Sequence, residues 1–199
     1  MLNKITKKIT NEIIVTVPNI TEEKAEQIQY GLYIAISDGL KLIAVMLTAY
    51  FLGQLPLALA GGAVFALNKS FLGGVHAKTQ LGCVITYFIF LFGAIYSSKI
   101  IDISCFNIIL FVVSGILVYF YAPADLASKP IITEKRWKEL RAQGSITVAV
   151  FFIITFFVPR EYSNIISIIT LINSINITPV LYKITKNRKG GIINEKIQN

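Results

Sequence analysis

Five long apolar stretches constrain this chain most, because a water-soluble domain of this size could not bury them all around one core. They cover residues 39–67, 79–96, 103–122, 146–158 and 163–182. A helix that crosses a bilayer needs about 20 mostly apolar residues and satisfies its own backbone hydrogen bonds in lipid. Charged residues make up 15% of the chain and hydrophobic residues 54%. The sequence therefore predicts an all-α, polytopic membrane protein.

The number of crossings depends on the first stretch, 39–67. It exceeds one ordinary span, and Gly53-Gln54-Leu55-Pro56 interrupts it with a turn signal. We interpret it as a hairpin of two short helices, which gives about six transmembrane helices in all. The positive-inside rule is then satisfied, because the Lys/Arg-bearing segments share one side and the poorer connections 97–102 and 159–162 share the other. The basic segments are 1–38, 68–78, 123–145 and 183–199.

The polar N-terminal region, residues 1–38, predicts two further helices. Leu2, Ile5, Ile9 and Ile13 recur at spacings of three and four, with lysines on the opposite side, as in an interfacial amphipathic helix. A second polar helix is expected over 21–37. We expect a single integral membrane domain, 1–199, with interfacial helices in 1–38, membrane segments in 39–182 and a basic cytoplasmic tail in 183–199. Both termini are then cytoplasmic.

The last stretch, 163–182, differs from the others because it carries several Asn, Ser and Thr residues among its isoleucines. In hydrocarbon such groups need hydrogen-bond partners, so this helix is expected to face protein or a polar cavity. The segment 134–141 predicts a short amphipathic helix on the cytoplasmic surface. Its basic side chains either contact lipid or bind an acidic segment of a peptide partner.

The charge and the cysteine content of the chain limit the kinds of ligand and cofactor that it is expected to bind. The chain holds 19 Lys and Arg against 11 Asp and Glu, for a net charge of +8. The basic residues gather between apolar stretches without interleaved aromatic residues, which favours anionic lipid or an acidic ligand over nucleic acid. No Cys/His cluster has metal-ligand spacing, and neither a metal nor another cofactor is expected.

One polar loop holds chemistry-bearing residues. It contains His76, the single histidine of the chain, and Cys83 follows seven residues later. An imidazole can take the proton of a thiol, whose thiolate is a strong nucleophile. On one straight helix the two side chains would lie about 10.5 Å apart along the axis. They can meet only if His76 lies in a loop that folds back and the helix begins near Thr79. Alternatively, His76 is an interfacial loop residue and Cys83 a small packing residue.

Two sequence strings resemble a known family. Gly73-Gly74-Val75-His76-Ala77 followed by Cys83, and Ala122-Pro123-Ala124-Asp125 followed by Lys129-Pro130-Ile131, are similar to signatures of the accessory gene regulator B (AgrB) family. Tyr30-Gly31-Leu32 is similar to an early segment of that family. These proteins are bacterial membrane cysteine endopeptidases that process precursors of cyclic autoinducer peptides.

The resemblance implies roles for particular residues. Cys83 would be the nucleophile and His76 the general base, and Asp125 is the candidate for orienting His76. Alternatively, Asp125 pairs with Lys129 as an ordinary loop acid. Lys69 stands where the family often has arginine and is a candidate substrate anchor, although lysine cannot contact a carboxylate through two parallel hydrogen bonds.

Other residues of these loops are candidates for orienting the site or contacting the substrate. Lys129 is one of them. Backbone N–H groups around Gly73 and Gly74, or at the start of the helix in 79–96, are candidate donors to the oxyanion of the reaction.

The predicted function is cleavage of a small quorum-sensing propeptide near its C-terminus, through a Cys83 thioester that allows cyclisation to a thiolactone or lactone. The expected partners are a peptide precursor with an amphipathic N-terminus and an acidic tail, the bilayer of a bacterial cell membrane, and a second copy of the chain in a homodimer. The alternative is a non-enzymatic small membrane protein, such as a six-helix substrate-binding subunit of a transporter.

Overall fold

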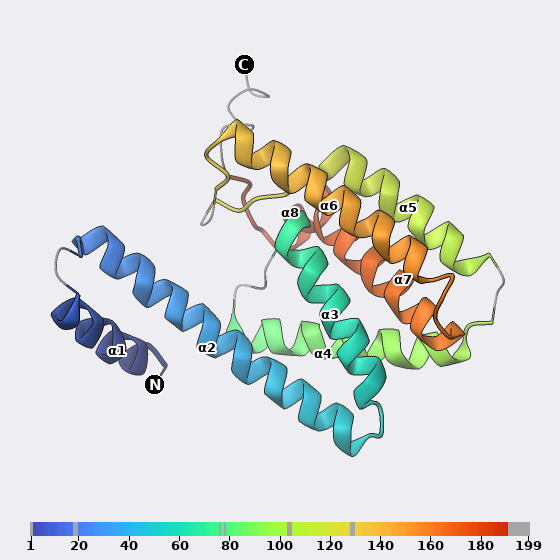
Figure 1. Ribbon diagram of the computed structural model, residues 1–199, viewed down its shortest axis with the longest axis horizontal. Helices are drawn as coiled ribbons and strands as arrows, with labels where there is room; N and C mark the ends of the chain where they lie inside the picture. The colour runs from blue at the N-terminus through green and yellow to red at the C-terminus, as the bar shows by residue number, and fades with distance from the viewer. Residues whose placement is uncertain are drawn as a thin grey trace. The chain divides into compact units, whose positions relative to one another are not determined.

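The computed structural model describes residues 2–17, 20–75, 77, 79–102, 105–127 and 130–190. Regular structure within these ranges is helical (Figure 1). The helices are α1 (Leu2–Thr16), α2 (Glu22–Phe51), α3 (Leu55–Leu72), α4 (Gln80–Ile100), α5 (Phe106–Tyr121), α6 (Glu134–Ile154), α7 (Arg160–Asn176) and α8 (Pro179–Ile184). The predicted all-α class is confirmed.

The chain divides into two compact units, Met1–Gly53 and Gln54–Asn199. The division falls in the predicted turn. Gly53 has a positive φ of 65°, which glycine adopts without the steric cost of a side chain, and Pro56 occupies the first turn of α3, where its missing N–H is tolerated. The interruption of the stretch 39–67 by a turn is therefore confirmed.

In the first unit, α1 packs against α2, and the buried side chains of α1 are those of Thr6 and Thr10. The N-terminal helix expected over residues 2–13 is present and extends to Thr16. The second expectation, a polar helix that ends at Ser37 before a separate short membrane helix, is wrong, because α2 is one helix of 30 residues. A single glycine such as Gly39 does not end a helix. The ion pair between Asp38 and Lys41 (2.9 Å) also joins the turns on either side of Gly39 and supports the helix there.

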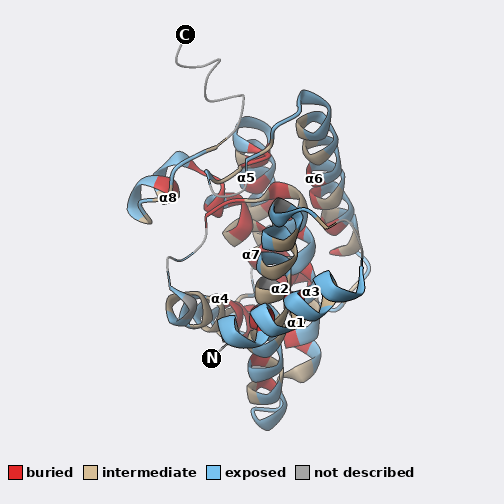
Figure 2. Ribbon diagram, turned by 90° about the vertical axis from the view of Figure 1, so that its left-hand side faces the viewer, coloured by how far each residue is buried: buried red, intermediate tan, exposed pale blue. Residues whose placement is uncertain are grey.

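In the second unit, α7 lies at the centre. It packs against α3, α4, α5 and α6, and it carries buried residues along its length (Figure 2). Some of its polar side chains bond to neighbouring helices and others to carbonyl oxygens of α7 itself. The Asn164 amide donates to the carbonyl oxygens of Ser98 and Ile101 (2.9 Å each), which satisfies the end of α4. The prediction that this helix faces protein is confirmed.

The segment 134–141 is not a separate surface helix. It forms the first part of α6, which continues without a break to Ile154. Gly144, in the middle of this helix, packs against Leu72 of α3, where an added Cβ would lie 2.7 Å from a leucine methyl group. The stretch 163–182 is also divided differently, because α7 ends at Asn176 and Pro179 starts the short α8.

Three of the described helices are long and apolar enough to cross a membrane: Lys24–Phe51, Leu55–Leu72 and Leu81–Ile100. The apolar helix α5 is shorter, yet it exposes a continuous apolar face that includes Ile109, Val112 and Ile116. Exposed apolar faces of this kind are typical of contact with lipid or another apolar partner. The expected membrane character is supported, and the count of about six transmembrane helices stays a prediction.

The second unit has two ends, separated by the length of α7, about 25 Å. At one end the connections 97–102 and 159–162 meet, because Asp102 forms an ion pair with Arg160 (2.6 Å). At the other end lie the last residues of α3 and α7 and the loop after α5. This second end carries the motifs singled out in the sequence.

Candidate active site

Cys83 lies at the start of α4, in a turn closed by Thr79. The Thr79 hydroxyl accepts a hydrogen bond from the Gly82 N–H (3.1 Å), and its carbonyl oxygen accepts one from the Cys83 N–H (3.0 Å). The Cys83 thiol is free and the residue is partly exposed. The helix thus begins where the sequence analysis expected it. An anion at this end of a helix meets the positive end of the helix dipole.

Two glycines turn the chain at the end of α3. Gly73 and Gly74 have φ values of 75° and 100°, which residues with a side chain rarely adopt. A Cβ on Gly73 would also collide with the carbonyl oxygen of Ala124, and one on Gly74 would lie 2.8 Å from the carbonyl oxygen of Asn176. Both positions therefore require glycine for conformation and for space.

Backbone hydrogen bonds join the two motif loops. The Gly74 N–H donates to the Ala124 carbonyl oxygen (2.9 Å), and the Ala124 N–H donates to the Leu72 carbonyl oxygen (2.8 Å). Ala122 and Ala124 are buried in this contact. Residues about fifty positions apart in the sequence are thus held side by side. The structure brings together the two strings that carry the family resemblance.

Val75 continues this loop and is fixed from two directions. Its N–H donates to the carbonyl oxygen of Asn176 at the end of α7 (3.1 Å). Its carbonyl oxygen accepts a hydrogen bond from the ammonium group of Lys69 (2.8 Å). The next residue, His76, lies outside the described residues, so its role as general base stays a prediction.

Lys69 points back toward the loop from the last turn of α3. Its ammonium group, besides binding the Val75 carbonyl oxygen, lies within electrostatic range of the Cys83 thiol. The side chain predicted to anchor the substrate is therefore engaged by the protein itself, close to the predicted nucleophile.

Asp125 is held in the second loop by both its side chain and its backbone. Its carboxylate accepts a hydrogen bond from the Ile131 N–H (3.1 Å), and its carbonyl oxygen accepts one from the Tyr182 hydroxyl (2.6 Å). Burial, together with the nearby carboxylate, raises the pKa of Tyr182, which keeps the phenol protonated as a donor. Lys129, the alternative partner of Asp125, lies outside the described residues.

Two residues that support the site are not indicated by any motif in the sequence. Asn176 is one of several Asn, Ser and Thr residues in the stretch 163–182, and its carbonyl oxygen accepts a hydrogen bond from the Val75 N–H. Tyr182 gave no signal in the sequence, yet its hydroxyl fixes Asp125. Backbone acceptors and single tyrosines carry no recognisable spacing, so neither role could be read from the sequence.

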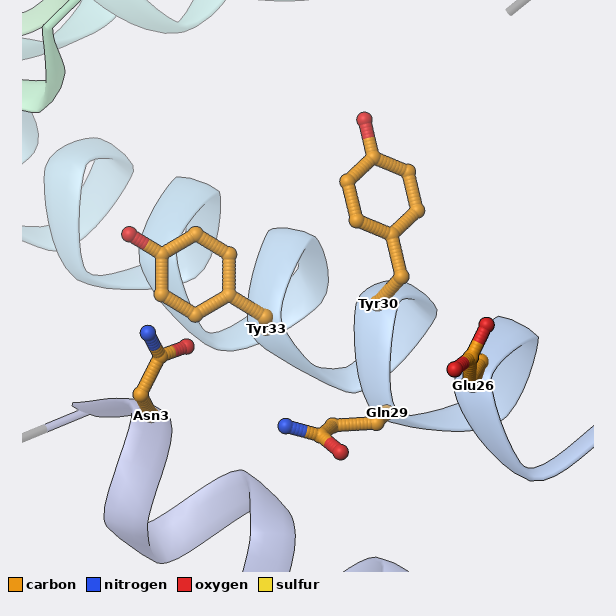
Figure 3. Close-up of a pocket in the computed structure, with 5 residues that line it drawn as sticks. All are labelled: Asn3, Glu26, Gln29, Tyr30 and Tyr33. Atoms are coloured by element: carbon orange, nitrogen blue, oxygen red, sulfur yellow. The ribbon is translucent and has the colours of Figure 1, made fainter. Parts of the chain in front are cut away.

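The first unit contains a separate hollow of about 520 Å³ between α1 and α2. Asn3 of α1 and Glu26, Gln29, Tyr30 and Tyr33 of α2 line it (Figure 3). Its lining of one carboxylate, two amides and two phenols is polar. Its lining includes no thiol and no imidazole, and it belongs to the unit that does not contain Cys83.

The fold and this site define an all-helical protein whose membrane-type helices carry a cysteine beside two joined loops. Comparison with known proteins identifies the family: the profile of Accessory gene regulator B matches residues 2–177, and the chain belongs to that family. This membership links the chain to the processing of autoinducer peptides.

Individual relatives agree with this assignment. An AgrB-like protein of Clostridium beijerinckii is 29% identical over 183 residues, which cover 89% of this chain and 85% of the relative. One of Clostridium acetobutylicum is 26% identical over 164 residues, covering 81% and 78%. One of Listeria innocua is 28% identical over 174 residues, covering 84% and 83%. No solved structure matches the chain.

Proposed function

We propose that this protein is a membrane cysteine endopeptidase that cleaves a small quorum-sensing propeptide near its C-terminus through a thioester on Cys83. The observation that carries the proposal is the pair of hydrogen bonds between Gly74 and Ala124 and between Ala124 and Leu72, which join the two motif loops at the residues just before His76. A partly exposed thiol at the start of α4 belongs to the same loop sequence.

The first step forms an acyl-enzyme. His76 takes the proton of the Cys83 thiol, and the thiolate attacks a peptide carbonyl carbon. The carbon–sulfur bond forms, the tetrahedral intermediate collapses, and the carbon–nitrogen bond breaks. The leaving amine takes the proton from His76 and departs as the C-terminal tail. The N-terminal part of the propeptide remains on Cys83 as a thioester.

The second step closes the ring. An internal thiol or hydroxyl group of the propeptide attacks the thioester carbon, and the Cys83 thiol is released. When the attacking group is a thiol, one thioester replaces another, so ring closure is nearly isoenergetic and needs no ATP.

The oxyanion of the tetrahedral intermediate needs hydrogen-bond donors. Of the candidates considered from the sequence, the N–H groups of Gly73 and Gly74 already donate to the carbonyl oxygens of Lys69 and Ala124. The first N–H groups of a helix have no partner within the helix. The Gly82 and Cys83 N–H groups donate to Thr79, so we favour the N–H groups of Gln80 and Leu81 at the start of α4, the segment that also carries Cys83.

The substrate, the assembly and the membrane orientation are part of the proposal. The substrate is a peptide with an amphipathic N-terminus and an acidic tail, and the net charge of +8 favours such a ligand. The enzyme works as a homodimer in a bacterial cell membrane with its termini and motif loops on the cytoplasmic side. The alternative of a transporter subunit loses support, because Ser163, Asn164 and Thr170 of α7 bond to neighbouring helices rather than lining a pathway.

Peptide cleavage in membranes tests this proposal. Vesicles containing the full chain are incubated with a precursor peptide of the stated chemistry that carries a C-terminal tag, and release of the tag is followed by mass spectrometry. We expect release by the wild-type protein and by Cys105→Ser, whose cysteine is exposed, and none by Cys83→Ala or His76→Ala. Equal release by Cys83→Ala would refute the proposed function.

A further inference from the structure

We propose that Lys69 is a positioning residue of the active site, which holds the loop before His76 and supplies positive charge to the Cys83 thiolate, rather than an anchor for the substrate. The inference rests on the proposed cysteine endopeptidase function. It follows from what the Lys69 ammonium group contacts within the protein itself.

The first observation is the hydrogen bond from Lys69 Nζ to the Val75 carbonyl oxygen (2.8 Å). Val75 is 8% exposed, and its N–H is bound to the carbonyl oxygen of Asn176. The peptide unit that joins Val75 to His76 therefore has its carbonyl oxygen fixed by Lys69. A displacement of the Lys69 side chain would free this oxygen and relax the loop that leads to the general base.

The second observation is electrostatic. Among the described residues, no carboxylate lies within ion-pair distance of the Lys69 ammonium group. The Asp125 carboxylate accepts a hydrogen bond from Ile131 instead. Cys83, in contrast, lies within electrostatic range of this ammonium. An ammonium group beside a cysteine favours the thiolate, which is the reactive form.

Of the helices packed against α3, α6 brings a charged residue toward this end of α3, because Arg141 stands one turn before Gly144, which packs against Leu72. On α4 the basic residue is Lys99, in the last turn, far along the helix from Cys83. On α7 the charged residues are Arg160 and Glu161, in the first turn, whereas α3 meets the loop at the other end of that helix. The charged residues of α6 lie in its first half, where Arg141 binds the Tyr119 carbonyl oxygen (2.8 Å).

These contacts separate two roles for Lys69. A substrate anchor would leave its ammonium group free for the peptide and would affect only reactions that involve the peptide. A positioning residue acts on Cys83 whether or not a peptide is bound. The reactivity of Cys83 without substrate therefore discriminates between the two roles.

The test measures the rate of iodoacetamide alkylation at Cys83 across pH, with the purified full-length protein in detergent and a Cys105→Ser background. We expect Lys69→Met to slow alkylation near neutral pH by about fivefold or more and to move the rate–pH profile to higher pH. Lys69→Arg should restore most of the rate, because it keeps the charge. Lys99→Met, which removes an exposed lysine at the far end of α4, is the matched control and should not change the rate.

A second variant keeps the test decisive if Lys69→Met does not fold. Lys69→Gln retains a hydrogen-bond donor without the charge, and we expect it to slow alkylation as well. Unchanged alkylation in a folded Lys69→Met or Lys69→Gln protein would overturn the inference, and a raised KM for the peptide would then assign Lys69 to substrate binding.

The outcomes distinguish this inference from the proposed function. If Cys83→Ala still cleaves the peptide, the proposed function fails. If Cys83→Ala abolishes cleavage while alkylation of Cys83 is independent of residue 69, the proposed function stands and the role of Lys69 is refuted.

Discussion

The backbone N–H of Gly74 donates to the carbonyl oxygen of Ala124 at 2.9 Å, which joins the loop after α3 to the loop after α5. This contact brings the two sequence motifs of the AgrB family into one structure at one end of the helical unit. It also explains why the turn consists of glycines, because a side chain on Gly73 would occupy the position of the Ala124 carbonyl oxygen.

We expect Gly73→Ala to destabilise the protein by about 1–3 kcal/mol or more, because it forces a side chain into a backbone conformation close to glycine-only and against Ala124. Cleavage should fall at least tenfold. Gly115→Ala is the matched control, since a Cβ there meets nothing within 4 Å. Thermal unfolding in detergent and tag release measure both effects. A Gly73→Ala protein with wild-type melting and cleavage would show that the loops do not need this contact.

The Asn164 amide satisfies two carbonyl oxygens at the end of α4. Asn164→Leu preserves the approximate volume but removes both hydrogen bonds, and leaving a buried carbonyl unsatisfied costs about 1–3 kcal/mol. We expect a lower melting temperature with an unchanged KM, because Asn164 lies at the end of the unit opposite Cys83. Asn11→Leu, on the exposed face of α1, is the control. An Asn164→Leu protein as stable as the wild type would contradict this role.

Tyr182→Phe removes the hydrogen bond to the Asp125 carbonyl oxygen and should cost about 0.5–1.5 kcal/mol. We expect cleavage to fall because the second loop loses its support. Tyr96→Phe, on an exposed tyrosine of α4, should have no effect on either quantity. Cleavage by Tyr182→Phe at the wild-type rate would separate this loop from the reaction.

The same phenol gives a pH dependence. Its pKa is raised in the folded protein, so the stability it contributes is fully present below the unfolded value of about 10 and is lost as pH rises through the higher folded value. We expect the phenolate absorbance at 295 nm to include a late-titrating component that becomes smaller in Tyr182→Phe. An unchanged titration curve in Tyr182→Phe would assign the late component elsewhere.

The connections 97–102 and 159–162 should face away from the cytoplasm. Asp102 is well exposed, with 76% of its side chain accessible, and its ion pair with Arg160 is a surface pair that contributes little to stability. Asp102→Cys in a Cys83→Ser, Cys105→Ser background should therefore fold. We expect a membrane-impermeant maleimide to label it from outside intact cells. Labelling from the cytoplasmic side alone would refute the proposed topology.

Much of the fold was predictable from periodicity and composition. The all-α class, the turn at Gly53 and the start of α4 near Thr79 follow from apolar run lengths and local capping, which are short-range properties. The sequence does not predict the lengths of α2 and α6, because a polar segment followed by an apolar one gives the same pattern whether or not the helix ends between them. A helix can pass from a polar into an apolar segment without interruption when no residue breaks its hydrogen bonds.

The sequence predicts the residue types of the candidate site, whose roles stay predictions, but it does not predict the contacts between the loops. The motif strings indicate that the regions of Gly73 and Asp125 act together. The contacts that join the two loops are backbone hydrogen bonds, which cannot be recognised from the spacing of side chains in the sequence. The hydrogen bond from Lys69 to the Val75 carbonyl oxygen could not be predicted either. A lysine that binds a carbonyl oxygen of its own protein looks the same in the sequence as a lysine that binds a substrate.

Detection of a covalent peptide on Cys83 tests the central claim most directly. Vesicles with the full chain are mixed with the precursor peptide, quenched in acid and digested, and the fragment that contains Cys83 is weighed. We predict an adduct with the mass of the N-terminal part of the precursor, removed by neutral hydroxylamine and absent from Cys83→Ala. Continued tail release without any adduct on Cys83, and with Cys83→Ala still active, would contradict the account.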